Sequence, residues 1–228
     1  MPRFRKSQSL REFQVFVKDV YGLPNDRSYS LGNLLTQQQR FSMRALKGIR
    51  KKDRKKIKLN LLISFSWFMS IANRLHIDVE DCVWKRFPML CSYCAGKPCR
   101  CKKIKPSKRQ KVRIDNALRP HALSEFQEMF RLIYPAKSRT LADAGVHLAE
   151  EMGEVAEAIH HYYGQHLHRQ FNDIQCEIAD FISCAFGVAN SAKIDVAEEL
   201  GKMFSRNCHV CHDAPCTCNF SSITKIKT

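Results

Sequence analysis

The stretch CSYCAGKPCRC, residues 91–101, carries four cysteines in the pattern CxxCx4CxC, and CHVCHDAPCTC, residues 208–218, repeats that pattern near the other end of the chain. Four thiolates in a compact segment match the tetrahedral ligand set of structural zinc. The closing cysteine pair is separated by only one residue, which is less common for zinc, so an iron–sulfur cluster remains an alternative and disulfides a weaker one. The sequence predicts two structural Zn²⁺ sites, formed by Cys91, Cys94, Cys99 and Cys101 and by Cys208, Cys211, Cys216 and Cys218.

The flanks of the two thiol stretches also repeat. A shift of 117 residues places IANRLHIDV, residues 71–79, over VANSAKIDV, residues 188–196. A shift of 113 residues places LREFQ, which begins at Leu10, over LSEFQ, which begins at Leu123. Similar segments in the same order favour an internal duplication of a unit of about 100 residues. The predicted organisation is a first unit at 1–101, a basic linker at 102–118, a second unit at 119–220 and a tail at 221–228.

Apolar residues in the second unit recur at three- and four-residue spacing, which is typical of amphipathic helices. The four segments with this spacing are 122–134, 145–164, 171–192 and 195–206. No comparable alternation typical of strands is present. Two such units bury their apolar faces best against each other, so we expect an all-α fold. The expected architecture is a tandem helical pseudo-dimer within one chain, in which each unit ends in a small four-cysteine zinc-binding segment.

Charge is unevenly distributed along the 228 residues, which carry a net charge of +16. Residues 1–115 contain 28 Lys and Arg against 8 Asp and Glu, whereas residues 116–228 contain 10 against 14. Most of the basic excess lies in RKKDRKK, residues 50–56, and in the linker. Such runs are either solvated loops or contacts for an anionic partner such as nucleic acid.

Cysteine usage and hydropathy indicate the compartment. The chain has 11 cysteines, an odd number with two tight clusters, and its most apolar stretch is too short and too polar for a membrane span. No signal peptide is evident at the N-terminus. We therefore expect a cytoplasmic protein that binds metal through its thiols and has no membrane partner.

Acidic residues are paired at helical spacing in the second unit. Glu151 and Glu154 lie three residues apart in EEMGE, and Glu177 and Asp180 lie three residues apart in EIAD. Residues at this spacing share a helix face. Carboxylates that converge between two helices repel one another unless a cation lies among them, and Mg²⁺ prefers oxygen ligands. The alternative for EEMGE is a solvated acidic face.

The motif EExxE, followed after 22 residues by ExxD, resembles that of the MazG-like members of the all-α nucleoside triphosphate pyrophosphatase superfamily. The resemblance implies that Glu151, Glu154, Glu177 and Asp180 bind Mg²⁺ or Mn²⁺ and that Glu150 orients or deprotonates water. It also implies hydrolysis of a nucleoside triphosphate to the monophosphate and pyrophosphate. Three further positions resemble substrate-contacting residues of the family, although each is also compatible with a surface or capping role: Asn190, Lys202 and Arg206.

The first unit lacks the acidic motif. The positions that correspond to Glu177 and Asp180 are Asn60 and Ile63, and the EExxE positions fall on Gln, Phe or Ser. We therefore expect this unit to keep the fold without the catalysis and to act as the packing partner of the second unit.

The sequence leaves a second class of function open, namely a zinc-containing, basic nucleic-acid-binding or adaptor protein on a retired pyrophosphatase scaffold. A further homo-oligomer also stays open. The base and sugar preference cannot be read from the sequence, and the candidates for base contacts are Phe126, Phe130, Tyr134 and His147. The histidine-rich segment 160–168 is either exposed or a substrate contact.

Overall fold

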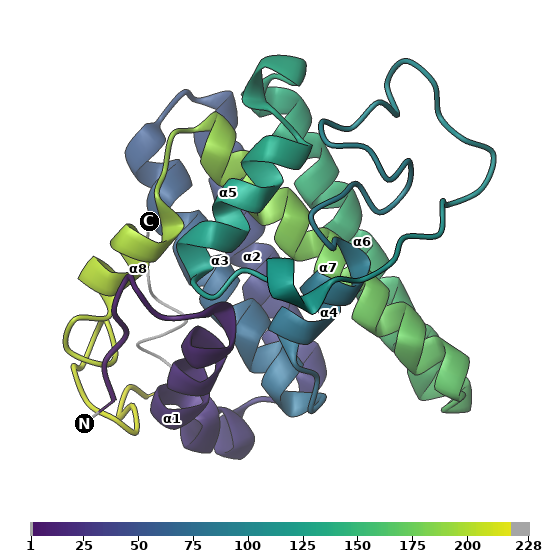
Figure 1. Cartoon of the computed structure of the whole chain (residues 1–228). Coiled ribbons are helices and arrows are strands. Elements are labelled where there is room, and N and C mark those ends of the chain that lie inside the picture. The colour runs from purple at the N-terminus through teal and green to yellow at the C-terminus, as the bar shows by residue number, and fades with distance from the viewer. Residues whose placement is uncertain (1, 220–228) are drawn as a thin grey trace.

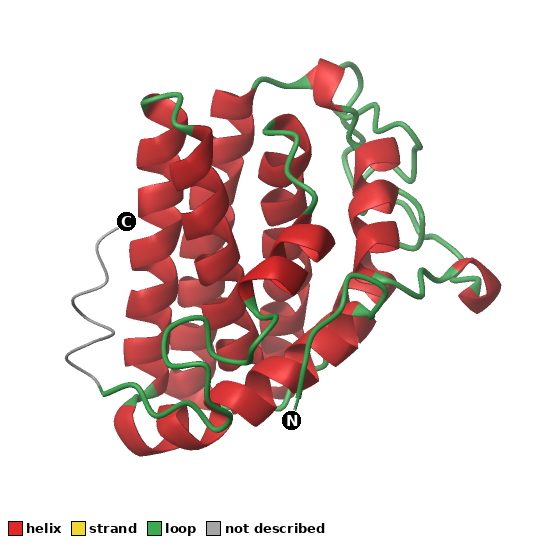
Figure 2. Cartoon of the chain, turned by 90° about the vertical axis from the view of Figure 1, so that its left-hand side faces the viewer, coloured by secondary structure: helices red, strands yellow, loops and turns green. Residues whose placement is uncertain are grey.

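The computed structural model of the chain describes residues 2–219, and those residues form helices and loops without a strand (Figure 1, Figure 2). The all-α prediction is therefore confirmed for this range. The first half contains α1 (Leu10–Ser28), α2 (Leu31–Arg50), α3 (Arg54–Arg74) and α4 (Val79–Arg86). The second half contains α5 (Leu123–Ile133), α6 (Leu141–Gln165), α7 (His168–Ser191) and α8 (Val196–Met203). Residue 220 and the predicted tail, 221–228, lie outside the described residues.

Side-chain caps explain where several of these helices begin. Asp78 accepts a hydrogen bond from the backbone of Asp81 at the start of α4, and Asp195 accepts one from Glu198 at the start of α8, both at 2.9 Å. Ser9 forms a reciprocal capping box with Glu12 at the start of α1. An acceptor at this position satisfies an otherwise unpaired backbone N–H and is worth about 1 kcal/mol.

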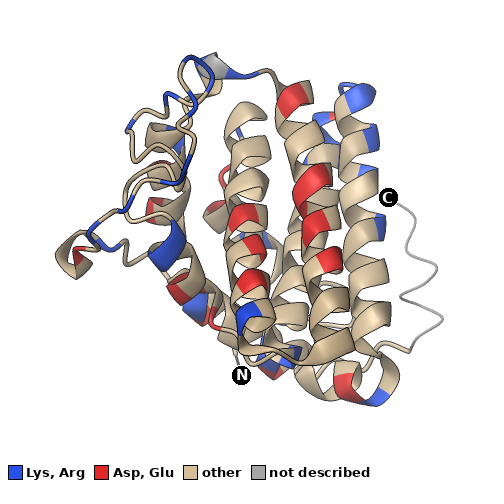
Figure 3. Cartoon of the chain, turned by 90° about the vertical axis from the view of Figure 1, so that its right-hand side faces the viewer, with Lys and Arg blue, Asp and Glu red and all other residues tan. Residues whose placement is uncertain are grey.

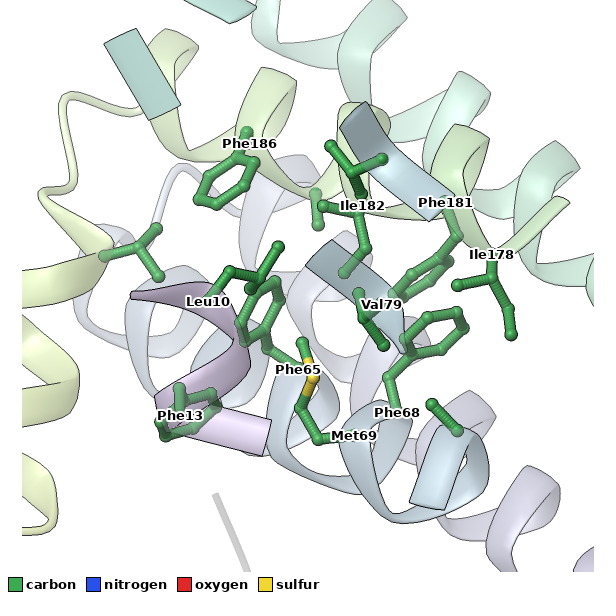
Figure 4. Packing of buried hydrophobic residues seen from close by; sticks show 14 of the residues in the cluster. Leu10, Phe13, Phe65, Phe68, Met69, Val79, Ile178, Phe181, Ile182 and Phe186 are labelled. Atoms are coloured by element: carbon green, nitrogen blue, oxygen red, sulfur yellow. The ribbon is translucent and has the colours of Figure 1, made fainter. Parts of the chain in front are cut away.

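The long helices pair as two hairpins, α2 with α3 and α6 with α7, because each pair is joined by a short connection. The central helices α3 and α7 meet through aromatic side chains (Figure 4). The rings of Phe68 and Phe181 stack with centroids 4.0 Å apart, and those of Phe65 and Phe186 lie 5.8 Å apart. Buried residues of both halves belong to one hydrophobic cluster. The two predicted units therefore share a single core.

A glutamine clamp occurs once in each half. The Gln14 side chain in α1 donates to Asn73 Oδ1 at 3.0 Å and to the Ile77 carbonyl at 2.7 Å, and it accepts from the Val79 N–H at 3.0 Å. Gln127 in α5 makes the same bonds to Asn190, Ile194 and Val196, at 2.9, 2.7 and 2.9 Å. The equivalent contacts support the duplication hypothesis, which concerns the origin of the chain and stays a prediction.

Each thiol segment packs against the first helix of the opposite half. The Cys99 N–H donates to the carbonyl of Ile133 in α5, and the Cys216 N–H donates to the carbonyl of Val20 in α1, both at 2.7 Å. The Tyr134 hydroxyl also donates to Cys91 Sγ at 3.4 Å. Each thiol segment therefore follows the last helix of its own half and also connects that half to the other.

The predicted linker packs back onto the first half at several points. Trp84 Nε1 in α4 donates to Asn116 Oδ1 at 2.9 Å, in the short 3-10 helix η1 (Asn116–Leu118). Just beyond the linker, Arg119 forms ion pairs with Glu80 and Asp81 at 3.1 and 2.9 Å. A second short helix, η2 (Ala136–Ser138), leads from α5 towards α6. The chain between the halves therefore has defined positions on the helical body.

Candidate acidic metal centre and thiol clusters

Acidic residues gather on two neighbouring helices, α6 and α7 (Figure 3). Carboxylate oxygens of Glu151 in α6 and of Glu177 and Asp180 in α7 all lie within 4.8 Å of one another. The antiparallel hairpin produces this convergence, because it faces one helical turn of α6 towards one turn of α7. Glu154 lies next to this group and affects Glu177, but it is exposed, and so is Glu150. Three of the five predicted acids therefore form the centre, whereas Glu150 and Glu154 are exposed.

Two carboxylate oxygens in this centre are buried without a hydrogen-bond partner among the described residues, namely Oε2 of Glu151 and Oε2 of Glu177. Burial and the charges of Asp180 and Glu154 raise the pKa of Glu151 to about 8. Burial and the same two neighbours raise the pKa of Glu177 to about 7. Unpaired buried carboxylates are costly, and a hard cation removes that cost by accepting their lone pairs. The three residues therefore fit a divalent cation.

An arginine from the first half enters the acidic centre. Arg86, at the end of α4, donates to Asp180 Oδ1 at 3.2 Å and to Oδ2 at 2.5 Å. Both side chains are largely buried, with 16% and 13% of their surfaces exposed. Arg109 from the loop after the first thiol cluster lies 3.9 Å from the same carboxylate. The sequence does not identify either arginine as a partner of this centre, because Asp180 lies 94 residues beyond Arg86 and no local pattern links them.

Arg139 lies beside α7 at Gly187, seven residues beyond Asp180. Its Nε is buried without a hydrogen-bond partner among the described residues, and its guanidinium lies 5.4 Å from the ring centroid of Tyr134. A Cβ at Gly187 would lie 2.5 Å from an Arg139 nitrogen, so a side chain there would displace the arginine.

The predicted substrate contacts lie outside the acidic group. Asn190 is engaged in the Gln127 clamp, and Lys202 Nζ contacts Glu198 and Glu199 at 2.6 and 3.2 Å. Arg206 is exposed after α8. Among the candidates for base contacts, Phe126 and Phe130 are core residues, Tyr134 is bonded to the first thiol cluster, and His147 is exposed. The geometry therefore directs attention to Arg86 and Arg139 instead.

The predicted zinc ligands form two compact groups of four sulfurs. Sγ–Sγ distances are 3.8 Å for Cys91–Cys101 and 3.9 Å for Cys94–Cys99. The corresponding distances in the second cluster are 3.9 Å for Cys208–Cys218 and 3.7 Å for Cys211–Cys216. Four sulfurs at tetrahedral zinc bond lengths lie about 3.8 Å apart. Both groups could therefore hold a structural zinc ion.

The environment of the sulfurs also suits a metal. Backbone N–H groups of Arg100 and Cys101 donate to Cys94 and Cys99, both at 3.4 Å. A hydrogen bond from Cys216 and one from Tyr21 lower the pKa of Cys208 to about 4 against its burial. All cysteines are unpaired at distances too long for a disulfide. A cluster of several irons holds its cysteines farther apart, because sulfide lies between them, so the spacing favours a single ion.

Comparisons with known proteins give no family assignment. No protein-family model, no curated protein and no solved structure matches the chain. The resemblance to the MazG-like superfamily therefore rests on the four-acid motif alone. None of the described helices has the length and apolar character that crossing a membrane requires.

Proposed function

We propose that the protein is a Mg²⁺-dependent nucleotide pyrophosphohydrolase that cleaves a nucleoside triphosphate to the monophosphate and pyrophosphate. The observation that carries the proposal is the convergence of Glu151, Glu177 and Asp180 within 4.8 Å, with two buried oxygens that lack a partner. A cation bound to a triphosphate needs several carboxylate oxygens in one place. An ordinary acidic helix face keeps its carboxylates apart and in water.

The residues around the centre suit distinct tasks in this reaction. Glu151, Glu177 and Asp180 would hold Mg²⁺, or Mn²⁺ in its place, which neutralises triphosphate charge when bound. Glu150 lies exposed on α6, where it would accept a proton from the attacking water. Arg139, with its unpaired Nε, would donate to a phosphate oxygen.

Arg86 has a positioning role in this proposal. It pairs with both oxygens of Asp180, and a carboxylate has enough lone pairs to serve an arginine and a cation together. Arg86 would thereby fix the orientation of Asp180 and add positive charge near the leaving pyrophosphate. The proposal thus gives the first half a function in the site, although that half lacks the four-acid motif.

The decisive experiment measures pyrophosphate release from a panel of ribo- and deoxynucleoside triphosphates with Mg²⁺. Glu151→Gln and Glu177→Gln are expected to lose at least about 100-fold in kcat/KM, because each removes a ligand charge. Glu157→Gln is the matched control, since Glu157 is on the same helix and exposed. Absence of turnover by the wild-type protein on every substrate, with helical content and zinc content intact, would reject the hydrolase.

A second candidate function is nucleic-acid binding by the loop after the first thiol cluster. Lys102, Lys103 and Lys105 in this loop are exposed, and Figure 3 shows basic residues along it. Exposed lysines release counterions from phosphates, so binding should weaken steeply as salt rises. Replacing these three lysines by Ser should reduce the salt slope, whereas replacing Lys47, Lys51 and Lys52 by Ser provides a charge-matched control. Equal effects of both triple variants would indicate only a diffuse attraction.

A further inference from the structure

A cavity lies in the first half, between α1, α3 and the second thiol cluster. Ile63, Trp67 and Ser70 of α3 form one wall, and Tyr21 and Asn25 of α1 form another. Cysteines of the second thiol cluster close one side.

This cavity shares one equivalent position with the acidic centre of the second half, whereas Asn60, the equivalent of Glu177, does not line it. The shift of 117 residues that aligns the thiol clusters places Ile63 at the position of Asp180 and Ser70 at that of Gly187. In the second half, Arg139 occupies the space beside Gly187. None of the described residues that line the cavity is a Lys, Arg, Asp or Glu. The second half therefore has an acidic centre, whereas the described lining of the cavity in the first half lacks these four residue types.

Aromatic rings supply much of the cavity wall. The rings of Tyr29 and Trp67 meet edge to face with centroids 5.3 Å apart, and those of Tyr21 and Phe204 meet in the same way at 6.3 Å. Both pairs line the cavity. Rings that are already fixed by their neighbours lose little freedom when a flat ligand stacks on them. The wall therefore favours a planar ligand.

A few buried polar groups interrupt the aromatic wall. Asn25 Nδ2 donates to Ser70 Oγ at 3.0 Å, and Ser66 Oγ donates to the Leu62 carbonyl at 2.9 Å. These bonds fix the amide and the hydroxyls and leave acceptor lone pairs on the serines. The cavity thus offers polar atoms to a ligand that carries donor groups at its edge. The described part of its lining offers no Lys or Arg side chain to a phosphate.

We propose that this cavity binds an uncharged planar nitrogen heterocycle, namely a nucleobase or a nucleoside without phosphate groups. The aromatic wall would stack on the ring, and the serine hydroxyls would meet its polar edge. Charge complementarity selects the ligand, because burying a phosphate needs a cation. The proposal does not depend on hydrolysis at the acidic centre, and it gives the first half a binding site of its own.

Tryptophan fluorescence tests the proposal directly. The chain has two tryptophans, and Trp84→Phe leaves Trp67, which lines the cavity, as the only emitter. Titration of this variant with adenosine, guanosine, cytidine and uridine should give a saturable change for at least one nucleoside, with a dissociation constant of about 0.1–1 mM. No saturable change from any of the four at about 10 mM, well above that constant, overturns the proposal.

A second variant locates the bound nucleoside. Ser70→Leu fills the cavity and should weaken binding at least tenfold, whereas Ser70→Ala keeps the space and should weaken it only by the few-fold that one lost hydrogen bond is worth. Undiminished binding by a Ser70→Leu variant with native helical content contradicts the proposal. If Ser70→Leu does not fold, the Glu151→Gln variant is titrated instead. Nucleoside binding in the cavity should be the same in this variant as in the wild type, and it should not require Mg²⁺. Binding that needs Mg²⁺ and is lost in Glu151→Gln would belong to the acidic centre and would overturn this assignment.

Discussion

Replacing Glu151 with Gln is expected to stabilise the Mg²⁺-free protein at alkaline pH, although it removes a proposed ligand. Burial, together with Asp180 and Glu154, raises the pKa of Glu151 from 4.5 to about 8. A carboxyl group with a higher pKa in the folded chain binds more protons when folded than when unfolded. The free energy of unfolding therefore falls as the pH rises from about 4.5 to about 8. Glutamine keeps the shape of the protonated group and avoids this loss.

The magnitude follows from the pKa. At about 1.4 kcal/mol per pH unit, the rise to about 8 gives an upper limit of about 5 kcal/mol. Water screens a carboxylate that is only partly buried, so we expect a gain of about 2 kcal/mol above pH 8. For a chain of this length, such a gain corresponds to an increase in Tm of about 4–8 °C. At pH 5.5 about a third of the gain should remain.

Thermal unfolding followed by circular dichroism at pH 5.5 and pH 9 measures this difference. No chelator should be present, because it would also compete for ions at the thiol clusters. Glu157→Gln is the control and should change Tm little at either pH. Mg²⁺ at about 100 times its dissociation constant should stabilise the wild type by about 2.7 kcal/mol and leave Glu151→Gln nearly unchanged. An equal gain at both pH values, or a net loss at pH 9, would refute the electrostatic reasoning.

Four further outcomes follow from the same contacts. Arg86→Met should lower the free energy of unfolding by about 3 kcal/mol in urea titrations, because it leaves a largely buried carboxylate unpaired, and Arg86→Lys should recover part of it. Cys208→Ser should reduce the zinc content measured by mass spectrometry from two ions to one per chain, whereas Cys176→Ser should not change it. Calorimetry should show Mg²⁺ binding at least about tenfold more tightly at pH 8.5 than at pH 6.5, because burial and neighbouring carboxylates raise the pKa of Glu151 to about 8 and that of Glu177 to about 7, and protons compete with the cation at both groups. Gln127→Ala should lower the free energy of unfolding by about 2–4 kcal/mol, because it leaves the partners of Gln127 buried and unpaired. A decrease below about 0.5 kcal/mol would contradict a stabilising role of the clamp.

Local signals in the sequence were sufficient for the helices and the thiol groups. Apolar spacing and caps such as Asp78 and Asp195 depend on residues within one or two turns, so they can be read from one sequence. The same holds for the cysteine spacing. The acidic pairs were also readable, since three-residue spacing places Glu177 and Asp180 on one face. The hairpin of α6 and α7 brings them to Glu151, and the sequence indicates this hairpin by two long periodic segments with a short connection between them.

Long-range partners could not be predicted in this way. Arg86 and Asp180 are separated by 94 residues, and nothing in either local segment identifies the other. Sequence reasoning also gave Asn190 a substrate role, whereas the structure places it in a clamp that its equivalent Asn73 shares. A buried amide and a ligand-binding amide look alike in a single sequence, because both need a polar residue on an otherwise apolar helix. Only the position of Gln127 distinguishes them.

The contacts between the halves give the half that lacks the acidic motif a structural role. The Cys99 segment of the first half is bonded to α5, the Cys216 segment of the second half is bonded to α1, and Arg86 crosses from α4 to α7. If the chain arose by duplication, these contacts correspond to contacts between the two subunits of a dimer. Fusion in one chain makes each of them intramolecular, which raises the effective concentration of the partner and fixes which copy donates the arginine. The copy that donates Arg86 would then not need the acidic motif itself. The first half supplies Arg86 and Arg109 to Asp180 of the second half, so part of the negative charge of the acidic centre is balanced by the first half.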